Sequence, residues 1–465
     1  MDDHGQEDLD RWLHDRIDPL PPPPGTFDLI KRRVRRRRYR QVAVSAAVAA
    51  AVAAAVVVVP RVAPSVLNVN QNPASNGAAA ARSATPSAPL PGPNKTPGGT
   101  SESKGATPVP TAPAPVPANF EPTSATFIGL HTGWVVGQAG TPGHCATQYC
   151  TSIARTTDAG QSWAGVPAPL TGAPDGSAGA SQIRFLSASD GWVFGPQLFA
   201  TTDGGQHWTA EGTAGQRVID LETVGTRAFA ILATCSGAGA DFAASCTSFS
   251  LYSTPAGQDA WSPVSGATGL AAGGAASSAA LVLTASQGYL LAPDGSVYAG
   301  PVSGGAWQQV SARPADGESC SPGAAQASGQ PSGALLAAAT ATSLVLDCNR
   351  PAAAGGGNQL FTSSDGGRAW LRTGPVFGAT VTAAAAQPGG EIVLAATDGI
   401  WVSHNGGSSW RPGQLSTTSP AGGFSWVGMT SDSQGVAISA DPSQHRIWFT
   451  FDGGQSWSPS PVSGP

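Results

Sequence analysis

The chain has 465 residues, of which 60 are Gly and 40 are Pro, and only 11% of its residues are charged. This length allows one large domain or several small ones, and the composition favours turns and loops over long helices. The net charge is −5, and residues 120–465 carry twenty acidic side chains against ten arginines and no lysine. Phosphate binding needs clustered Lys and Arg, so we do not expect nucleic acid as a partner of this part of the chain.

Residues 1–40 are predicted to form a tail that changes from acidic to basic. Residues 1–30 carry eight acidic and two basic side chains and several prolines, a composition typical of disorder. Residues 31–40 carry eight basic side chains. Such a run can bind nucleic acid, but here it directly precedes an uncharged apolar stretch, which favours a membrane role.

The apolar stretch Val42–Val59 contains eight Val, nine Ala and one Ser. As a helix it would be about 27 Å long, close to the ~30 Å of a bilayer core. We therefore predict a transmembrane signal anchor over residues 41–62. Basic residues on its N-terminal side place the N-terminus in the cytoplasm and the rest of the chain outside, in a single-pass protein of the cell membrane. The alternative is a cleaved signal peptide, although the preceding charged region and the apolar run are both longer than usual.

Residues 63–119 consist largely of Pro, Ala, Ser, Thr, Gly and Asn. They cannot bury a core, so we predict a disordered, extended linker. Such a stalk would carry the following domain away from the bilayer.

Residues 120–465 contain a repeated octapeptide with Ser or Thr first, Asp or Asn third, Gly fifth and Trp eighth. Its five clear copies are Thr156–Trp163, Thr201–Trp208, Ser363–Trp370, Ser403–Trp410 and Thr450–Trp457. We interpret each as a tight turn between antiparallel strands, in which the Asp or Asn oxygen binds turn amides and the Trp begins the next strand. One Asp per repeat also fits a catalytic or calcium-binding pattern, but we place none of these residues in a site.

This pattern resembles the Asp-box of the sialidase-like, BNR-repeat β-propellers. The flanking runs Gly133-Trp134-Val135-Val136-Gly137 and Gly191-Trp192-Val193-Phe194-Gly195 resemble the photosystem II assembly and stability factor branch. The resemblance covers residues ~120–465. It implies a propeller fold and, for that branch, a role in assembly.

Two degenerate copies of the repeat fill the gaps, ending at Trp261 and Trp307. The resulting Trp series has intervals of 40 to 63 residues, which suit four-stranded blades with loop insertions. We therefore predict an all-β, seven-bladed propeller over residues 120–465.

All six cysteines follow the predicted anchor, and an even number outside the cytoplasm indicates disulfides. The simplest pairing is Cys145–Cys150, Cys235–Cys246 and Cys320–Cys348. A zinc site at His144 and Cys145 is the alternative, but the sequence lacks C-x-x-C spacing and a second His there. We expect no metal and no cofactor.

The long connections are predicted to lie on one face of the ring. Repeat turns join the third and fourth strands of a blade, whereas expansions at Gln138–Gln148, Ser236–Ala244, Ala312–Gly333 and Asn349–Gly357 belong to the opposite face. Each predicted disulfide touches one of these loops. Protection from proteolysis would explain this arrangement, but we favour a partner site with contacts from His144, Gln148, Tyr149, Asp241, Phe242, Glu318, Asn349 and Arg350.

The sialidase resemblance also raises the possibility of catalysis. Sialidases use three substrate-binding arginines, a Tyr nucleophile paired with an acid, and an Arg-Ile-Pro signature. The Arg-Ile-Pro signature is absent from this sequence. Of the tyrosines after the linker, Tyr252, Tyr289 and Tyr298 fall on predicted strands. We therefore predict a non-enzymatic binding or assembly scaffold for a protein or cell-envelope polysaccharide, with an exported sialidase-like glycoside hydrolase as the alternative.

Overall fold

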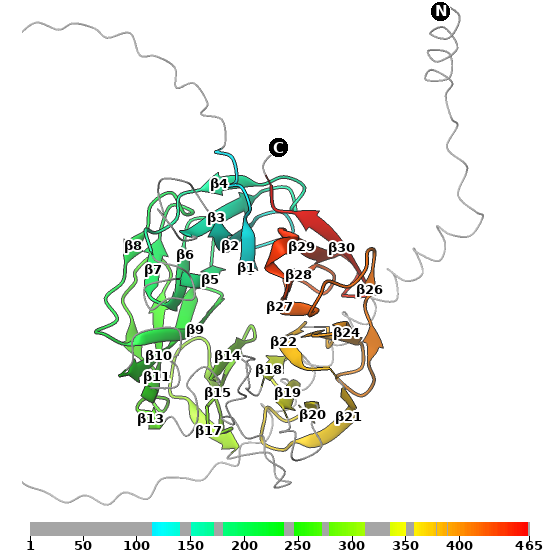
Figure 1. The fold of residues 1–465 in the computed structure, drawn as a ribbon. Helices are drawn as coiled ribbons and strands as arrows, with labels where there is room; N and C mark the ends of the chain where they lie inside the picture. The colour runs from blue at the N-terminus through cyan, green and yellow to red at the C-terminus, as the bar shows by residue number, and fades with distance from the viewer. Residues whose placement is uncertain are drawn as a thin grey trace, which may run out of the picture. The chain divides into compact units, whose positions relative to one another are not determined.

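The structure is a computed structural model that describes residues 114–139, 150–171, 180–236, 246–271, 279–311, 335–349, 358–377, 379–387 and 389–463. These residues form seven antiparallel sheets around a common centre (Figure 1). Each sheet contains four consecutive strands paired in chain order, with the first strand innermost, and two of the sheets carry a fifth, two-residue strand. The seven blades predicted from the Trp spacing are confirmed, including complete blades at Trp261 and Trp307.

The strands are given from the centre of the ring outward. The innermost strands are β1 (Glu121–Phe127), β5 (Ala180–Phe185), β9 (Arg217–Val224), β14 (Ala280–Leu283), β18 (Leu335–Ala338), β22 (Val381–Ala386) and β27 (Phe424–Met429). The second strands are β2 (Gly133–Ala139), β6 (Gly191–Pro196), β10 (Arg227–Cys235), β15 (Gln287–Leu291), β19 (Leu344–Asn349), β23 (Ile392–Ala396) and β28 (Gly435–Ser439). The third strands are β3 (Cys150–Thr156), β7 (Leu198–Thr201), β11 (Cys246–Pro255), β16 (Val297–Pro301), β20 (Asn358–Ser363), β24 (Gly399–Ser403) and β29 (Arg446–Thr450). The outermost strands are β4 (Ala164–Val166), β8 (Thr209–Ala210), β12 (Ser262–Pro263), β17 (Gln308–Ser311), β21 (Leu371–Phe377), β25 (Arg411–Pro412) and β30 (Ser456–Pro461).

Three further elements sit at the rim. Strand β13 (Leu270–Ala271) pairs with β11, and β26 (Gln414–Leu415) pairs in parallel with β30. The 3₁₀ helix η4 (Pro442–Gln444) joins β28 to β29. Within the described residues no helix has the length and apolarity needed to cross a bilayer, and the predicted anchor lies outside them.

The connections define two faces of the ring. We call the side that holds the first-to-second and third-to-fourth strand connections the turn face, because the five octapeptides lie there. The side that holds the second-to-third strand and the blade-to-blade connections is the loop face. Since each blade is a simple meander, the two sets of connections must lie on opposite sides.

The five clear octapeptide turns share one hydrogen-bond pattern. The first hydroxyl accepts from the amide of the fifth-position glycine at 2.8–3.0 Å. The third-position Asp or Asn oxygen accepts from the amide of the seventh residue at 2.9–3.0 Å. Both side chains therefore hold turn amides, as the sequence predicted for the Asp or Asn.

The tryptophan after each turn packs between two blades. Trp163 lies in one apolar cluster with Phe449 of the preceding blade in the ring, and Trp457 lies in another with Val402. The two degenerate repeats do the same, since Trp261 meets the ring of Trp192 at 6.1 Å and Trp307 meets Phe229 at 5.9 Å. The remaining three are Trp208, whose indole donates to Pro167, Trp370, whose indole donates to Ser311, and Trp410, which packs with Val345.

Among the described residues the ring closes between blade 7 and blade 1 without strand exchange, because each blade holds only consecutive strands. We call this junction the seam. Its contacts include one apolar cluster from both blades, a hydrogen bond from Gln434 Nε2 to the Leu130 carbonyl (2.8 Å), and one from Ser460 Oγ to the Gly160 carbonyl (2.8 Å). Ahead of β1, Ala114 bridges to Gly165 of β4, so packed residues extend into the end of the segment predicted as linker.

The fifth-position glycine predicts a steep cost of substitution. Gly160 has φ +82, and a Cβ there would lie 2.3 Å from Phe449 Cζ. We expect Gly160→Ala to lower the free energy of unfolding by about 3 kcal/mol, because overpacking adds to left-handed strain. Gly406→Ala, with φ +67 and open space, should cost only about 1 kcal/mol. Denaturant unfolding measures both, and equal costs would contradict the role of the blade contact.

Candidate functional site

The described cysteines lie at the roots of the loop-face connections. Cys150 begins β3, Cys348 lies near the end of β19, and the disulfide Cys235–Cys246 joins the end of β10 to the start of β11. This confirms one of the three predicted pairings. Cys348 is also disulfide-bonded, but its predicted partner Cys320 lies outside the described residues, as does Cys145. The other two pairings therefore stay predictions.

Of the eight predicted contact residues, only Asn349 falls within the described chain. It is the last residue of β19 and pairs with Asn358 of β20 at the root of a loop-face connection. The other seven, His144, Gln148, Tyr149, Asp241, Phe242, Glu318 and Arg350, lie outside the described residues. The structure thus does not bring them together or separate them.

A buried polar pair lies beside Asn349. Asp347 on β19 is 0% exposed, and its Oδ2 accepts a hydrogen bond from Asn358 Nδ2. Its Oδ1 has no hydrogen-bond partner. Burial raises the pKa of Asp347 to about 7, only partly opposed by the Asn358 hydrogen bond. The carboxyl is therefore neutral in mildly acidic solution, at the base of a predicted partner loop.

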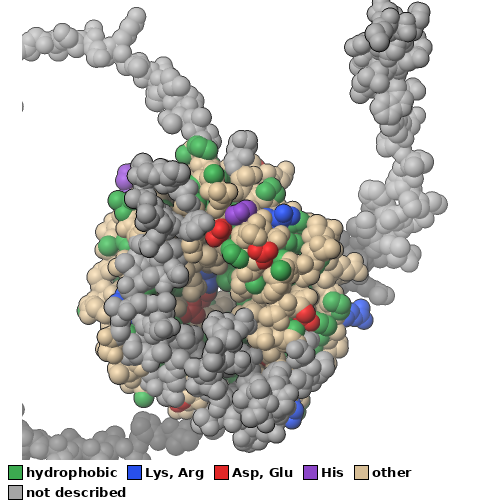
Figure 2. All heavy atoms as spheres, in the orientation of Figure 1, with side chains coloured by type: hydrophobic (Ala, Val, Ile, Leu, Met, Phe, Trp, Pro, Cys, Tyr) green, Lys and Arg blue, Asp and Glu red, His purple; other side chains and the backbone are tan. Residues whose placement is uncertain are grey.

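A second polar cluster lines the centre of the ring. Arg184 of β5 forms a salt bridge with Glu222 of β9 at 2.7 Å and donates to Ser124 Oγ of β1 at 3.2 Å. Asp220 of β9 accepts from the amide of Leu281 on β14 at 2.8 Å. These residues tie the innermost strands of blades 1 to 4 together. Figure 2 shows acidic and basic side chains on the wall of the hollow at the ring's centre.

The ionisable groups of this central cluster differ in their pKa shifts. Burial, reinforced by the neighbouring Glu222 carboxylate, raises the pKa of Asp220 to about 7, although Arg184 and two backbone amides oppose the shift. Burial lowers the pKa of Arg184, but Glu222 more than offsets this, so the net shift is upward. The cluster therefore combines an ion pair with a carboxyl that gains a proton easily.

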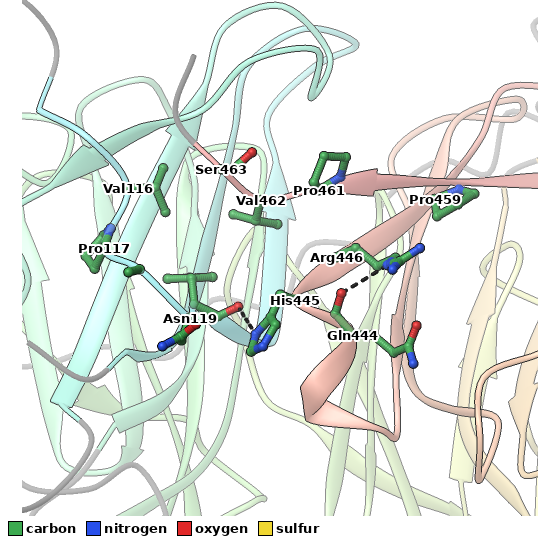
Figure 3. A pocket seen from close by; sticks show the side chains of 12 residues that line it. Val116, Pro117, Asn119, Gln444, His445, Arg446, Pro459, Pro461, Val462 and Ser463 are labelled. Carbon is green, nitrogen blue, oxygen red and sulfur yellow. Dashed lines mark hydrogen bonds between the residues drawn. The ribbon is translucent and has the colours of Figure 1, made fainter.

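A cavity of about 450 Å³ opens on the loop face at the seam (Figure 3). Its walls come from the segment before β1, from η4 and β29, and from the end of β30. Val116, Pro461 and Val462 supply apolar wall, and His445 bonds through Nδ1 to the Phe120 carbonyl at 3.2 Å. The Arg446 guanidinium donates to the Gln444 carbonyl at 3.0 Å. The cavity thus offers a mixed apolar and polar lining beside the entry of the linker.

The central cluster and the seam cavity were not found by sequence reasoning. Asp220 and Glu222 lie outside the repeat turns, and no repeated sequence pattern pairs them. The usable signal was Asp-x-Glu on an innermost strand, with Arg184 on the innermost strand of the preceding blade. Two side chains at positions i and i+2 of a strand, such as the carboxylates of Asp-x-Glu, face the same side of the sheet. Across the described ranges no group of three or more His, Cys, Asp or Glu could hold a metal ion.

No protein-family model and no curated protein matches the chain. Among solved structures, YCF48 bound to D1 peptide is 18% identical with a TM-score of 0.47, covering 73% of this chain and 95% of that one. YCF48 from Cyanidioschyzon merolae is 14% identical with a TM-score of 0.42, covering 61% and 85%. The GH74 xyloglucanase from Xanthomonas campestris is 14% identical with a TM-score of 0.42, and the match covers 72% of this chain but 60% of the enzyme. The seven-bladed ring is the fold implied by the resemblance to Asp-box propellers, and at these identities no activity or partner follows.

The buried Asp347 predicts a pH dependence of stability. Because its pKa is raised in the folded state, the protonated carboxyl favours folding at low pH, and this contribution is lost as the pH rises towards about 7. Asp347→Asn keeps an acceptor for Asn358 and removes the titration. Between pH 5 and pH 8 we expect the free energy of unfolding of the variant, relative to that of the wild type, to rise by about 3 kcal/mol. Denaturant unfolding measures this difference.

The control for this experiment is Asp398→Asn at an exposed position. It should leave the pH dependence unchanged. A wild-type stability that does not fall relative to Asp347→Asn over this pH range would show that Asp347 is ionised throughout.

Proposed function

We propose that this protein is a membrane-anchored, extracytoplasmic β-propeller that acts as a binding or assembly scaffold for a protein or a cell-envelope polysaccharide. The partner would bind the loop face. The observation that carries the proposal is the location of the disulfides, because Cys235–Cys246 and the disulfide-bonded Cys348 stand at the roots of loop-face connections.

Disulfides at these positions favour binding for an entropic reason. Cys235 and Cys246 are 11 residues apart, and closing a loop of about that length restricts the unfolded chain by roughly 3 kcal/mol. A loop that is already restrained loses less freedom when it binds a partner. The turn face, by contrast, carries short turns of one repeated geometry, which offer little variation for recognition.

The proposal is tested by comparing the two faces. A pull-down with the full chain would supply the partner, and alanine at Tyr149, Phe242 or Arg350 should then weaken binding by about tenfold each. Alanine at the turn-face residues Gln161, Gln206 or Arg368 should change the dissociation constant by less than twofold. The reverse pattern would place this partner on the turn face.

The anchor is tested separately from the partner. With the basic residues 31–40 held in the cytoplasm, protease added to intact cells should remove the propeller and leave a small protected N-terminal fragment. Cells opened with detergent provide the control, in which the fragment is also lost. A propeller that stays protected in cells whose envelope admits the protease would contradict this topology.

One observation favours the glycoside hydrolase alternative. Asp220, with its raised pKa, and Glu222, paired with Arg184, resemble a proton donor beside a second carboxylate. Against this, Asp220 already accepts two backbone amides, from Leu221 and Leu281. We expect no hydrolysis of aryl glycosides, sialosides included, by the full chain. Turnover that disappears in Glu222→Gln but persists in Glu391→Gln would establish the hydrolase instead.

A further inference from the structure

Two large apolar side chains are exposed at the turn-face end of the seam. Leu130, between β1 and β2, is 51% exposed, and Phe451, between β29 and β30, is 60% exposed. Together they form what we call the seam patch. It lies on the face opposite to the predicted partner loops.

Both residues depart from the pattern of the other blades. The second position of the octapeptide holds Phe451 in blade 7, whereas the other four copies hold Thr157, Thr202, Ser364 and His404. Leu130 stands three residues after Phe127, and the matching hairpin of blade 2 has Ala188 three residues after Phe185. The turn geometry therefore does not require either apolar side chain.

The two side chains are held around a common turn. The Phe451 ring stacks on Phe449 at 5.8 Å with an interplanar angle of 6°, and Phe449 packs edge-on against Phe127 at 5.7 Å. The Gly453 amide donates to the Ser433 carbonyl at 2.9 Å, and the neighbouring Gln434 donates to the Leu130 carbonyl at 2.8 Å. The turns that carry Leu130 and Phe451 thus both contact Ser433–Gln434. The aromatic stack restrains Phe451, so little side-chain freedom remains to be lost on binding.

The turns around the seam patch carry an excess of acidic side chains. Asp158, Asp432 and Asp452 stand on these turns, with His131 as the basic residue among them. Each of the three carboxylates already accepts a hydrogen bond, from the amides of Ser162, Gly389 and Ser456 respectively. The surroundings therefore suit positive charge.

We propose that the seam patch docks a segment of a partner protein that carries an apolar side chain flanked by Lys or Arg. The apolar side chain would cover Leu130 and Phe451, and the cations would meet the three carboxylates. A second copy of this chain is a poorer occupant, because two acidic rims would face each other. Two exposed side chains also supply much less apolar area than a stable dimer buries. This site is separate from the loop-face site proposed above and does not depend on it.

The experiment uses the full chain in detergent micelles and two fluorescein-labelled peptides as probes. One is acetyl-Lys-Leu-Lys-Phe-Lys-amide, and the other replaces each Lys with Glu. Fluorescence anisotropy should show saturable binding of the Lys peptide and none of the Glu peptide. Raising the salt from 0.05 to 0.5 M should weaken the binding, since charge pairs at a surface are screened.

The matched variants separate the patch from general apolar binding. The double variant Leu130→Ala, Phe451→Thr introduces at these two positions the residue types that other blades have at the equivalent positions. It should bind the Lys peptide at least tenfold more weakly. Leu371→Thr removes a side chain that is 69% exposed on blade 5 and should leave the affinity unchanged. Thermal unfolding confirms that both variants are folded.

Three outcomes would overturn the proposal. They are the absence of Lys-peptide binding to wild type, equal affinity in the double variant, and equal affinity for the Glu peptide. Sedimentation velocity tests whether a second copy of this chain binds the patch instead. Self-association of the wild type that disappears in the double variant would identify a second copy as the occupant. Loss of loop-face binding in the Tyr149, Phe242 and Arg350 variants would not affect any of these results.

Discussion

The close approach of fifth-position octapeptide glycines to the preceding blade, as at Gly160, Gly407 and Gly454, constrains the geometry of the ring. At Gly160 the neighbouring Phe449 leaves no room for a Cβ, and at Gly454 a Cβ would meet Val393 and Val402 at 3.1 Å. The tryptophan three residues later fills the remaining space between the same two blades. Because turn, glycine and indole all act at one boundary, the repeat encodes the contact between blades as well as the turn within each blade. Stability of such an array then depends on nearest-neighbour interfaces.

Regularity and variation are separated in this molecule. The turn face repeats the same hydrogen bonds in five turns, so its chemistry differs only where a residue is not needed for the turn, as at Phe451. The loop face carries the described disulfide, a buried carboxyl with a raised pKa at Asp347, and the seam cavity. The ring centre holds Arg184 and Glu222, which join neighbouring blades. Each region therefore has a structural role of its own.

The sequence predicted the blades well because the residues that recur in the repeat each have a steric or hydrogen-bonding reason to be where they are. Thr201, Asp203, Gly205 and Trp208 act within one octapeptide, so their spacing alone carries the information. Contacts between distant segments leave no such trace. The Arg184–Glu222 bridge joins residues on different blades, and the parallel pairing of β26 with β30 follows no alternation pattern. The predicted loop-face contacts stay predictions, since apart from Asn349 they lie outside the described residues.

Closure of the ring without strand exchange has a consequence for how the chain folds during synthesis. Every blade is complete once its own fourth strand has emerged, so no blade waits for a strand from the other end of the chain. Each new sheet can dock on the one before it through local contacts, which are fast to form. Only the last step, the meeting of blade 7 with blade 1, joins residues some three hundred positions apart, as Gln434 and Leu130 are. The seam is therefore the slowest interface to form, and until it does an incomplete ring exposes the apolar edges of its first and last blades.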